Sequence, residues 1–160
     1  MTIAVGDKMP AGSFSVMGDS GPESLASDEL FAGKKVVLVS VPGAFTPTCS
    51  KGHLPGYITH ADDLAASGVD TIACMAVNDV FVMDAWGKDR GVGDKVVMLA
   101  DGNGEYTAAL GLELDASGFG MGKRGQRFAI VVDDGVARHV AVEEGGALEV
   151  SKAEAILASL

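Results

Sequence analysis

Apolar runs alternate with amphipathic segments along the chain and predict strands that alternate with helices. The run from Lys35 to Val41 is nearly continuous in β-branched residues, as expected of a strand buried on both faces, and Pro42-Gly43 ends it. The same criteria predict strands over 14–17, 35–41, 70–77 and 96–100 and helices over 47–68 and 80–86. Helical crossovers of this kind place the central strands parallel in one sheet.

The last third of the chain has a different pattern and predicts antiparallel strands. Residues 127–132 and 136–142 are two mainly apolar runs joined by Asp133-Asp134-Gly135, which is typical of a tight hairpin. A closing helix is predicted over 152–160, and the glycine-rich stretch 118–125 is predicted to be a mobile loop. No linker or repeat divides the sequence, so we expect one α/β domain over 1–160 with a mixed central sheet.

Composition and charge favour a globular protein and disfavour proteins that bind nucleic acid or span a membrane. The 160 residues are 48% hydrophobic, which is enough for a sizeable core. The net charge of −10 comes without a basic cluster, so nucleic acid is an unsuitable partner. No segment has the pattern of a membrane span or a targeting leader, and only two cysteines are present. We therefore expect a soluble cytoplasmic protein.

Cys49 stands where a fold commonly places a reactive thiol, between a buried strand and the start of a helix. Pro47 suits the first turn of a helix and forces Thr46 into an extended conformation, so the Thr46 hydroxyl can face the sulfur. Unpaired N–H groups and the positive end of the helix dipole surround a thiol in that turn and favour the thiolate, the reactive form.

The spacing around Cys49 also excludes one kind of chemistry. Thr46-Pro47-Thr48-Cys49 has the shape of a Cys-x-x-Cys motif whose first cysteine is replaced by threonine, so no disulfide closes inside it. This disfavours a disulfide oxidoreductase. Cys49 is then a nucleophile resolved by another thiol or an inert core residue, and its polar, proline-containing surroundings favour the nucleophile.

Several blocks of sequence resemble the peroxiredoxins, and within them the type II subgroup that uses glutathione or glutaredoxin. The resemblance rests on residues 42–50 (Pro-Gly-Ala-Phe-Thr-Pro-Thr-Cys-Ser), 53–57, 77–86, 110–115 and 127–129, in family order over nearly the whole chain. It implies a thioredoxin fold with N-terminal additions. It also implies a thiol peroxidase that reduces hydrogen peroxide and alkyl hydroperoxides without a metal or bound cofactor.

The resemblance assigns roles to four residues. Cys49 is the peroxidatic nucleophile, which becomes a sulfenic acid; Thr46 hydrogen-bonds the sulfur and the peroxide; Pro42 shields the thiolate; and Arg127 holds both reactants. A permanently charged, planar donor set at Arg127 also suits a transition state in which charge develops on oxygen. A zinc site from Cys49, Cys74 and His53 is disfavoured, because structural zinc needs four ligands in paired short spacings.

Two further residues near these motifs are weaker candidates. The family pattern Arg-Ser-x-Arg reads Arg124-Gly125-Gln126-Arg127 in this chain, so Arg124 is expected to be a solvated loop charge or a contact to a thiol partner. His53 lies four residues after Cys49, but a packing or loop-ordering role is favoured over that of a general base.

Cys74 decides how the sulfenic acid is recycled. It lies inside an apolar strand, where a buried and inert thiol is the default. Some relatives carry a resolving cysteine near the C-terminus, whereas residues 148–151 of this chain contain none. We expect reduction by external glutathione and glutaredoxin; the alternative is a Cys49–Cys74 disulfide reduced by thioredoxin.

Two other expectations concern partners. Aromatic residues near the predicted site, Phe45, Phe81 and Trp86, are candidates for a homodimer interface, which the resemblance also implies. A different class of function is a redox sensor or holdase-like binding module, in which Cys49 oxidation changes partner affinity. Rapid catalytic loss of peroxide distinguishes the peroxidase from the sensor.

Overall fold

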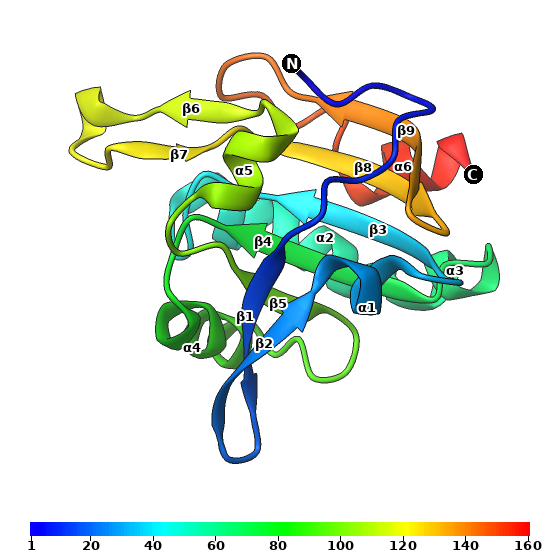
Figure 1. Cartoon of the computed structure of the whole chain (residues 1–160), viewed down its shortest axis with the longest axis horizontal. Coiled ribbons are helices and arrows are strands. Elements are labelled where there is room, and N and C mark those ends of the chain that lie inside the picture. The colour runs from blue at the N-terminus through cyan, green and yellow to red at the C-terminus, as the bar shows by residue number, and fades with distance from the viewer.

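The strands of the computed structural model, which describes residues 1–160, form one seven-stranded mixed sheet and a separate two-stranded ribbon (Figure 1). The sheet order is β2-β1-β5-β4-β3-β8-β9, and the ribbon pairs β6 with β7. Strands β3, β4 and β5 are parallel neighbours, and all other pairings are antiparallel. The predicted mixed α/β sheet is confirmed.

The elements have the following bounds. The strands are β1 (Ser13–Gly18), β2 (Gly21–Ala26), β3 (Lys35–Ser40), β4 (Thr71–Ala76), β5 (Val97–Ala100), β6 (Glu113–Asp115), β7 (Lys123–Gly125), β8 (Phe128–Asp133) and β9 (Val136–Val142). The helices are α1 (Ser27–Phe31), α2 (Leu54–Thr59), α3 (Ala61–Ala66), α4 (Val80–Arg90), α5 (Glu105–Leu110) and α6 (Ala153–Ser159). A π-helical turn, η1 (Cys49–His53), precedes α2, and a 3₁₀ turn, η2 (Ser117–Phe119), lies between the ribbon strands.

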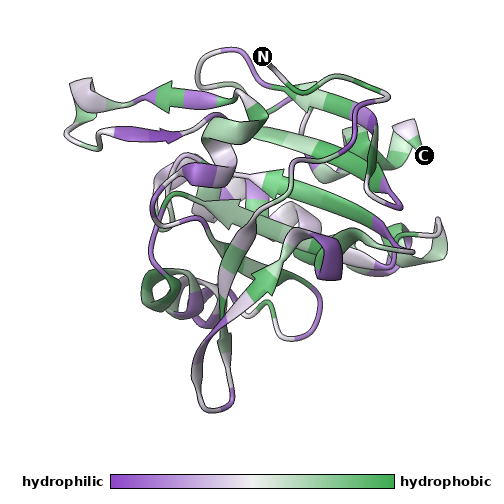
Figure 2. Ribbon diagram, viewed as in Figure 1, coloured by the Kyte–Doolittle hydropathy of each residue, from purple (hydrophilic) through white to green (hydrophobic).

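Both faces of the sheet are buried at its centre: every residue of β3 after Lys35 and of β4 after Thr71 is buried, and most of these residues are apolar (Figure 2). Side chains of β3 alternate between two cores: Val37 and Val39 face one, and Val36 and Leu38 face the other. Helices α2, α3, α4 and α6 cover the first core, and α1 and α5 cover the second. The first core contains both cysteines.

The continuous apolar runs predicted the central elements closely. Strands β3, β4 and β5 lie within the predicted ranges, and the β8–β9 hairpin turns at Asp134 and Gly135, which both have positive φ. Helix α4 extends four residues beyond the predicted end and stops at Gly91, which adopts the left-handed conformation. Residues 47–59 are helical, as predicted, and a break at His60 separates α2 from α3.

The structure also contains elements that the sequence pattern did not predict. Strand β2, helix α1 and helix α5 are short and weakly periodic. Strand β2 forms by pairing with β1, and α1 and α5 each bury one side in the second core. The predicted mobile loop 118–125 is corrected: its last three residues are strand β7, paired with β6. That pairing supplies backbone partners that glycine-rich composition alone does not reveal.

The helices are short, and α4 is the longest at 11 residues. None has the length and apolar composition needed to cross a bilayer.

Candidate active site

Cys49 lies at the point where the chain leaves the sheet after β3 and begins a helix. The helical conformation starts at Pro47, and Cys49 opens the π-helical turn η1, in which the Leu54 N–H donates to the Cys49 carbonyl. This confirms the predicted position in the first helical turn. The residue is completely buried and belongs to the core between the sheet and α2.

The loop that leads to Cys49 is fixed by its own backbone and by Asn78. The Ala44 N–H donates to Asn78 Oδ1 at 2.9 Å, and Phe45 adopts φ of 65°, a strained conformation for an aromatic residue. The Thr46 hydroxyl donates to the Gly43 carbonyl at 2.7 Å. The expectation that Thr46 bonds the sulfur is therefore corrected: its proton is held by the backbone, and its oxygen keeps free lone pairs.

Arg127 is the polar partner of the Cys49 sulfur. Its Nη2 donates to Sγ at 3.1 Å, and its Nη1 donates to His53 Nδ1 at 3.0 Å. Arg127 is only 7% exposed, and none of the ion pairs in the structure involves its guanidinium. A buried cation needs a nearby anion, and Cys49 is the residue beside it that can become one. The structure thus brings together the predicted Cys49 and Arg127, 78 positions apart.

His53 is a neutral acceptor for Arg127. Because Arg127 donates to Nδ1, the ring proton sits on Nε2 and is donated to the Ser151 carbonyl at 3.0 Å. Burial and then the Arg127 charge lower the pKa of His53 to about 4. A group this weakly basic, aimed at the arginine and not at the sulfur, orders the site, as predicted, and does not act as a general base.

Glu143 holds residues 149–151, the segment whose Ser151 carbonyl accepts the hydrogen bond from His53. Sequence reasoning missed this role. Its Oε2 accepts from the backbone N–H of Glu149 and from both the N–H and the hydroxyl of Ser151, at 2.7 to 2.8 Å. Burial raises the pKa of Glu143, but these hydrogen bonds outweigh burial and leave it below its usual value. The Tyr57 hydroxyl also donates to the Ser151 carbonyl. Nothing in the local sequence distinguishes Glu143 from the adjacent Glu144 or marks it as part of a site.

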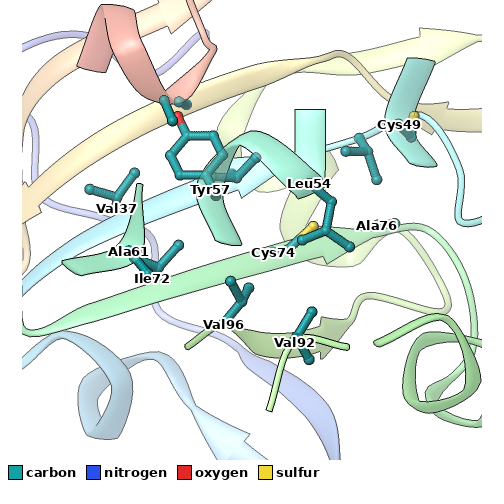
Figure 3. Packing of buried hydrophobic residues seen from close by; sticks show 14 of the residues in the cluster. Val37, Cys49, Leu54, Tyr57, Ala61, Ile72, Cys74, Ala76, Val92 and Val96 are labelled. Carbon is teal, nitrogen blue, oxygen red and sulfur yellow. The ribbon is translucent and has the colours of Figure 1, made fainter. Parts of the chain in front are cut away.

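Cys74 lies on the middle strand of the sheet, away from solvent. Strand β4 pairs with β3 and β5, and Cys74 lies opposite Val39 and Met98. Burial, and then the proximity of Cys49, raise the pKa of the Cys74 thiol far above its usual range. Figure 3 shows Cys74 on the strand and Cys49 on the helical segment, with Leu54 extending toward the Cys74 sulfur. The structure shows the buried environment that was predicted for Cys74.

Arg124 lies closer to the site than its loop position suggested. Its Nη1 donates to the Pro42 carbonyl at 3.4 Å and its Nε to the Met121 carbonyl at 2.9 Å. A Cβ added to Gly43 would lie 3.1 Å from Nη1. Arg124 therefore supports the Pro42 loop and is half-buried, not a freely solvated charge.

The three aromatic interface candidates divide into two groups. Phe45 and Phe81 are 51% and 63% exposed, which leaves them available to a partner. Trp86 is completely buried, so the expectation that it lies in an interface is corrected. Its ring packs in the core, with Phe45 at a centroid distance of 6.4 Å, and its Nε1 donates to Ser50 Oγ.

A cavity of about 650 Å³ lies apart from this site. It lies between α4, β1 and residues 91–98, and its lining includes none of Cys49, Thr46, Pro42, Arg127 and His53. No group of three or more His, Cys, Asp or Glu side chains is arranged to hold a metal ion.

Comparison with known proteins gives consistent matches over the whole chain. A model of the Redoxin family matches residues 4–157. The chain is 50% identical to Peroxiredoxin-2B of Arabidopsis thaliana over 159 residues, which covers 99% of this chain and 98% of that one. Reduced Prx3 of Vibrio vulnificus in complex with H2O2 superimposes with a TM-score of 0.95 at 52% identity, covering 99% of each chain. A Burkholderia cenocepacia structure described as a putative thioredoxin reductase superimposes with a TM-score of 0.98 at 47% identity, covering 100% of this chain and 99% of that one.

Proposed function

Because this chain belongs to the Redoxin family and is a peroxiredoxin, a thiol peroxidase of thioredoxin-like fold, we propose that Cys49 is its peroxidatic residue and that glutathione and glutaredoxin recycle it. Peroxide is the substrate that family membership implies. The identity of the nucleophile, its supporting residues and the reductant are inferred from the geometry.

The contact between Arg127 and Cys49 carries this proposal. A guanidinium that is nearly buried, without a carboxylate partner and 3.1 Å from a sulfur, is stabilised when that sulfur is a thiolate. The opening turn of the helix adds N–H groups that favour the same charge. Cys74 has no comparable cation or helix start, so Cys49 is the nucleophile of the pair.

In the reaction, the Cys49 thiolate attacks the terminal oxygen of the hydroperoxide. An S–O bond forms, the O–O bond breaks, and the leaving alkoxide or hydroxide takes up a proton as water or an alcohol. Cys49 is left as a sulfenic acid. Arg127 is fixed before the reaction and can donate to the oxygen on which charge develops, which lowers the barrier.

Thr46 and Pro42 complete the site from the loop. The Thr46 hydroxyl gives its proton to Gly43, so it meets a peroxide as an acceptor and orients the peroxide O–H. Pro42 lacks an N–H and its carbonyl accepts from Arg124, and its proposed role is to limit hydration of the thiolate. Complete burial of Cys49 favours a small reactant over a protein thiol in this step.

Recycling by an external thiol follows from the placement of Cys74. A disulfide between Cys49 and Cys74 would require part of the central strand or of the helix over it to unfold, because both residues are in the same packed core. Glutathione attacks the sulfenic sulfur to give a mixed disulfide and water. Glutaredoxin or a second glutathione then releases the Cys49 thiol.

Intact mass spectrometry of reduced protein, treated with a small excess of hydroperoxide with and without glutathione, tests both steps. We expect a glutathione adduct that requires peroxide and is absent in Cys49→Ser. Cys74→Ala is the matched control and is expected to form the adduct as the unaltered protein does. Loss of two hydrogens that is insensitive to glutathione and abolished by Cys74→Ala would instead establish Cys74 as the resolving cysteine and favour thioredoxin.

Three further features remain proposals. Exposed Phe45 and Phe81 support a homodimer beside the site. A cytoplasmic location rests on the presence of only two cysteines, neither in a disulfide. A redox-sensor role would be favoured over recycling catalysis if peroxide oxidised Cys49 only once, without turnover in excess glutathione.

A further inference from the structure

Helix α4 is bonded to the Cys49 turn through a single residue, Ser50. Trp86 Nε1 donates to Ser50 Oγ at 2.8 Å, and Arg90 Nη1 donates to the Ser50 carbonyl at 3.2 Å. Trp86 and Arg90 are four positions apart and therefore lie on one face of α4. These two bonds, termed here the Ser50 contact, hold both the side chain and the backbone of the residue that follows the nucleophile.

Pro55 explains why the Ser50 carbonyl is free to accept from α4. In a π-helical turn each N–H bonds the carbonyl five residues earlier, as Leu54 does to Cys49. The residue that would serve Ser50 in the same pattern is Pro55, which has no N–H. The Arg90 guanidinium supplies the missing donor, so a contact from another element replaces a bond that the helix cannot make for itself.

Recycling requires the Cys49 turn to open. No part of Cys49 is exposed, and a tripeptide thiol such as glutathione cannot approach its sulfur along the S–O bond while the turn is packed in the core. Trp86 is equally buried, so breaking its bond to the half-buried Ser50 would leave the indole N–H in the core without this partner, which is costly. Opening the turn breaks the Ser50 contact.

We propose that Trp86 and Arg90 are positioning residues that set how often the Cys49 turn opens, and through this the fate of the sulfenic acid. In the open state, glutathione displaces water and forms the mixed disulfide. In the closed state, a second hydroperoxide transfers an oxygen to the sulfenic sulfur, giving the sulfinic acid and an alcohol or water. This inference rests on the proposed function, and it predicts that a weaker Ser50 contact favours recycling over over-oxidation.

Thiol labelling of the reduced protein tests the contact without peroxide. The variants are Ser50→Ala, which removes the Trp86 bond, and Arg90→Gln, which weakens the carbonyl bond. Lys88→Gln is the control, because Lys88 is an exposed residue of α4 paired only with Asp84. A bulky maleimide is added, and labelling of Cys49 and Cys74 is measured separately by peptide mass. Cys74, on the central strand, reports opening of the whole sheet.

We expect Cys49 labelling to be about three- to tenfold faster in the two variants, as loss of one hydrogen bond implies, with Cys74 labelling and Lys88→Gln unchanged. Amide hydrogen exchange over residues 49–59 is expected to accelerate in parallel, which separates opening from altered thiol reactivity. An equal rise at both cysteines, or no rise at Cys49, overturns the inference.

A second measurement tests the consequence for oxidation. At fixed hydroperoxide and glutathione, the fraction of Cys49 found as sulfinic acid is expected to fall in Ser50→Ala and Arg90→Gln relative to Lys88→Gln. An unchanged fraction despite faster labelling would overturn the link to over-oxidation. If the unaltered protein forms no glutathione adduct, the proposed recycling fails, whereas the labelling result still decides the role of the Ser50 contact.

Discussion

At the residue scale, the site depends on the Arg127 guanidinium, which donates hydrogen bonds to two different residues at once. Arg127 donates through Nη2 to the sulfur and through Nη1 to a neutral imidazole, and the imidazole is held in turn by the Ser151 carbonyl. This chain of contacts fixes the plane of the guanidinium before any peroxide arrives. It also requires His53 to be neutral, because only an unprotonated Nδ1 can accept the hydrogen bond from Arg127.

Replacing Arg127 by lysine keeps the positive charge and removes the planar pair of donors. A single ammonium cannot serve both Cys49 and His53 at the observed distances, so we expect kcat/KM for hydroperoxide to fall by roughly 10²- to 10³-fold. Stopped-flow peroxide reduction with circular dichroism of the folded protein measures this. Arg138→Lys, on the exposed side of β9, is the control. A loss of less than threefold in Arg127→Lys would contradict the assigned role.

Protonation of His53 predicts a loss of stability in mild acid. Its pKa of about 4 lies below the ordinary value of 6.5, so the unfolded chain binds the proton more tightly and the free energy of unfolding decreases as pH falls through this interval. We expect a loss of about 2 kcal/mol between about pH 7 and pH 5 from this residue. Carboxylates with lowered pKa, such as Glu143, contribute mainly below that interval.

Urea denaturation at a series of pH values measures the effect of His53. The slope of stability with pH is expected to flatten in His53→Gln and to persist in His139→Gln, which alters a half-buried histidine of β9. Equal slopes in the two variants would show that other groups cause the acid sensitivity.

At the scale of elements, short helices depend on what caps them. Helix α5 has six residues and ends at Gly111, whose φ of 72° is left-handed. The N-terminal segment packs on this cap: the Ile3 N–H donates to the Leu110 carbonyl, and a Cβ on Gly111 would lie 2.5 Å from the Met1 carbonyl oxygen. The cap therefore needs glycine for both its conformation and the space beside it.

Gly111→Ala and Gly120→Ala form a matched pair that separates these two requirements. Both glycines have φ near 70°, but nothing lies within 4 Å of a Cβ at Gly120. We expect Gly120→Ala to lower the free energy of unfolding by about 1 kcal/mol and Gly111→Ala by about 2 to 3 kcal/mol. Chemical denaturation measures both. Equal losses would mean that the terminal segment moves aside freely.

At the scale of the whole molecule, two large aromatic side chains, Phe81 and Phe119, are exposed to solvent. Phe81 lies on α4, the helix that also contacts Ser50, while Phe119 is 86% exposed at the far end of the β6–β7 ribbon. Phe81 belongs to the proposed dimer interface, and Phe119 lies outside it.

Phe81→Asp is expected to convert the proposed dimer to monomer, because a buried charge replaces an aromatic contact and raises the dissociation constant by about thirtyfold or more. Light scattering after size exclusion measures the mass over a concentration series. Phe119→Asp is expected to leave the mass unchanged. A monomeric unaltered protein would rule out the dimer, and a dimeric Phe81→Asp would place its interface elsewhere.

The sequence by itself determined the central sheet, the position of Cys49 and the family. Long apolar runs such as 35–41 have one stable placement, buried between two layers, and a proline-containing turn after such a strand fixes where the next helix starts. The β8–β9 hairpin is equally local, because Asp134-Gly135 is a residue pair that readily adopts the positive φ angles of a tight turn.

Only the tertiary structure decided which side chains meet. The Arg127–His53–Ser151–Glu143 chain joins segments 74 to 98 positions apart in its longer links, and no local pattern specifies such a contact. Tertiary packing likewise placed Trp86, a predicted interface residue, in the core and bonded it to Ser50. Hydrophobic periodicity sets which face of an element is buried, whereas the partner of a buried polar atom depends on which elements the fold brings to that face.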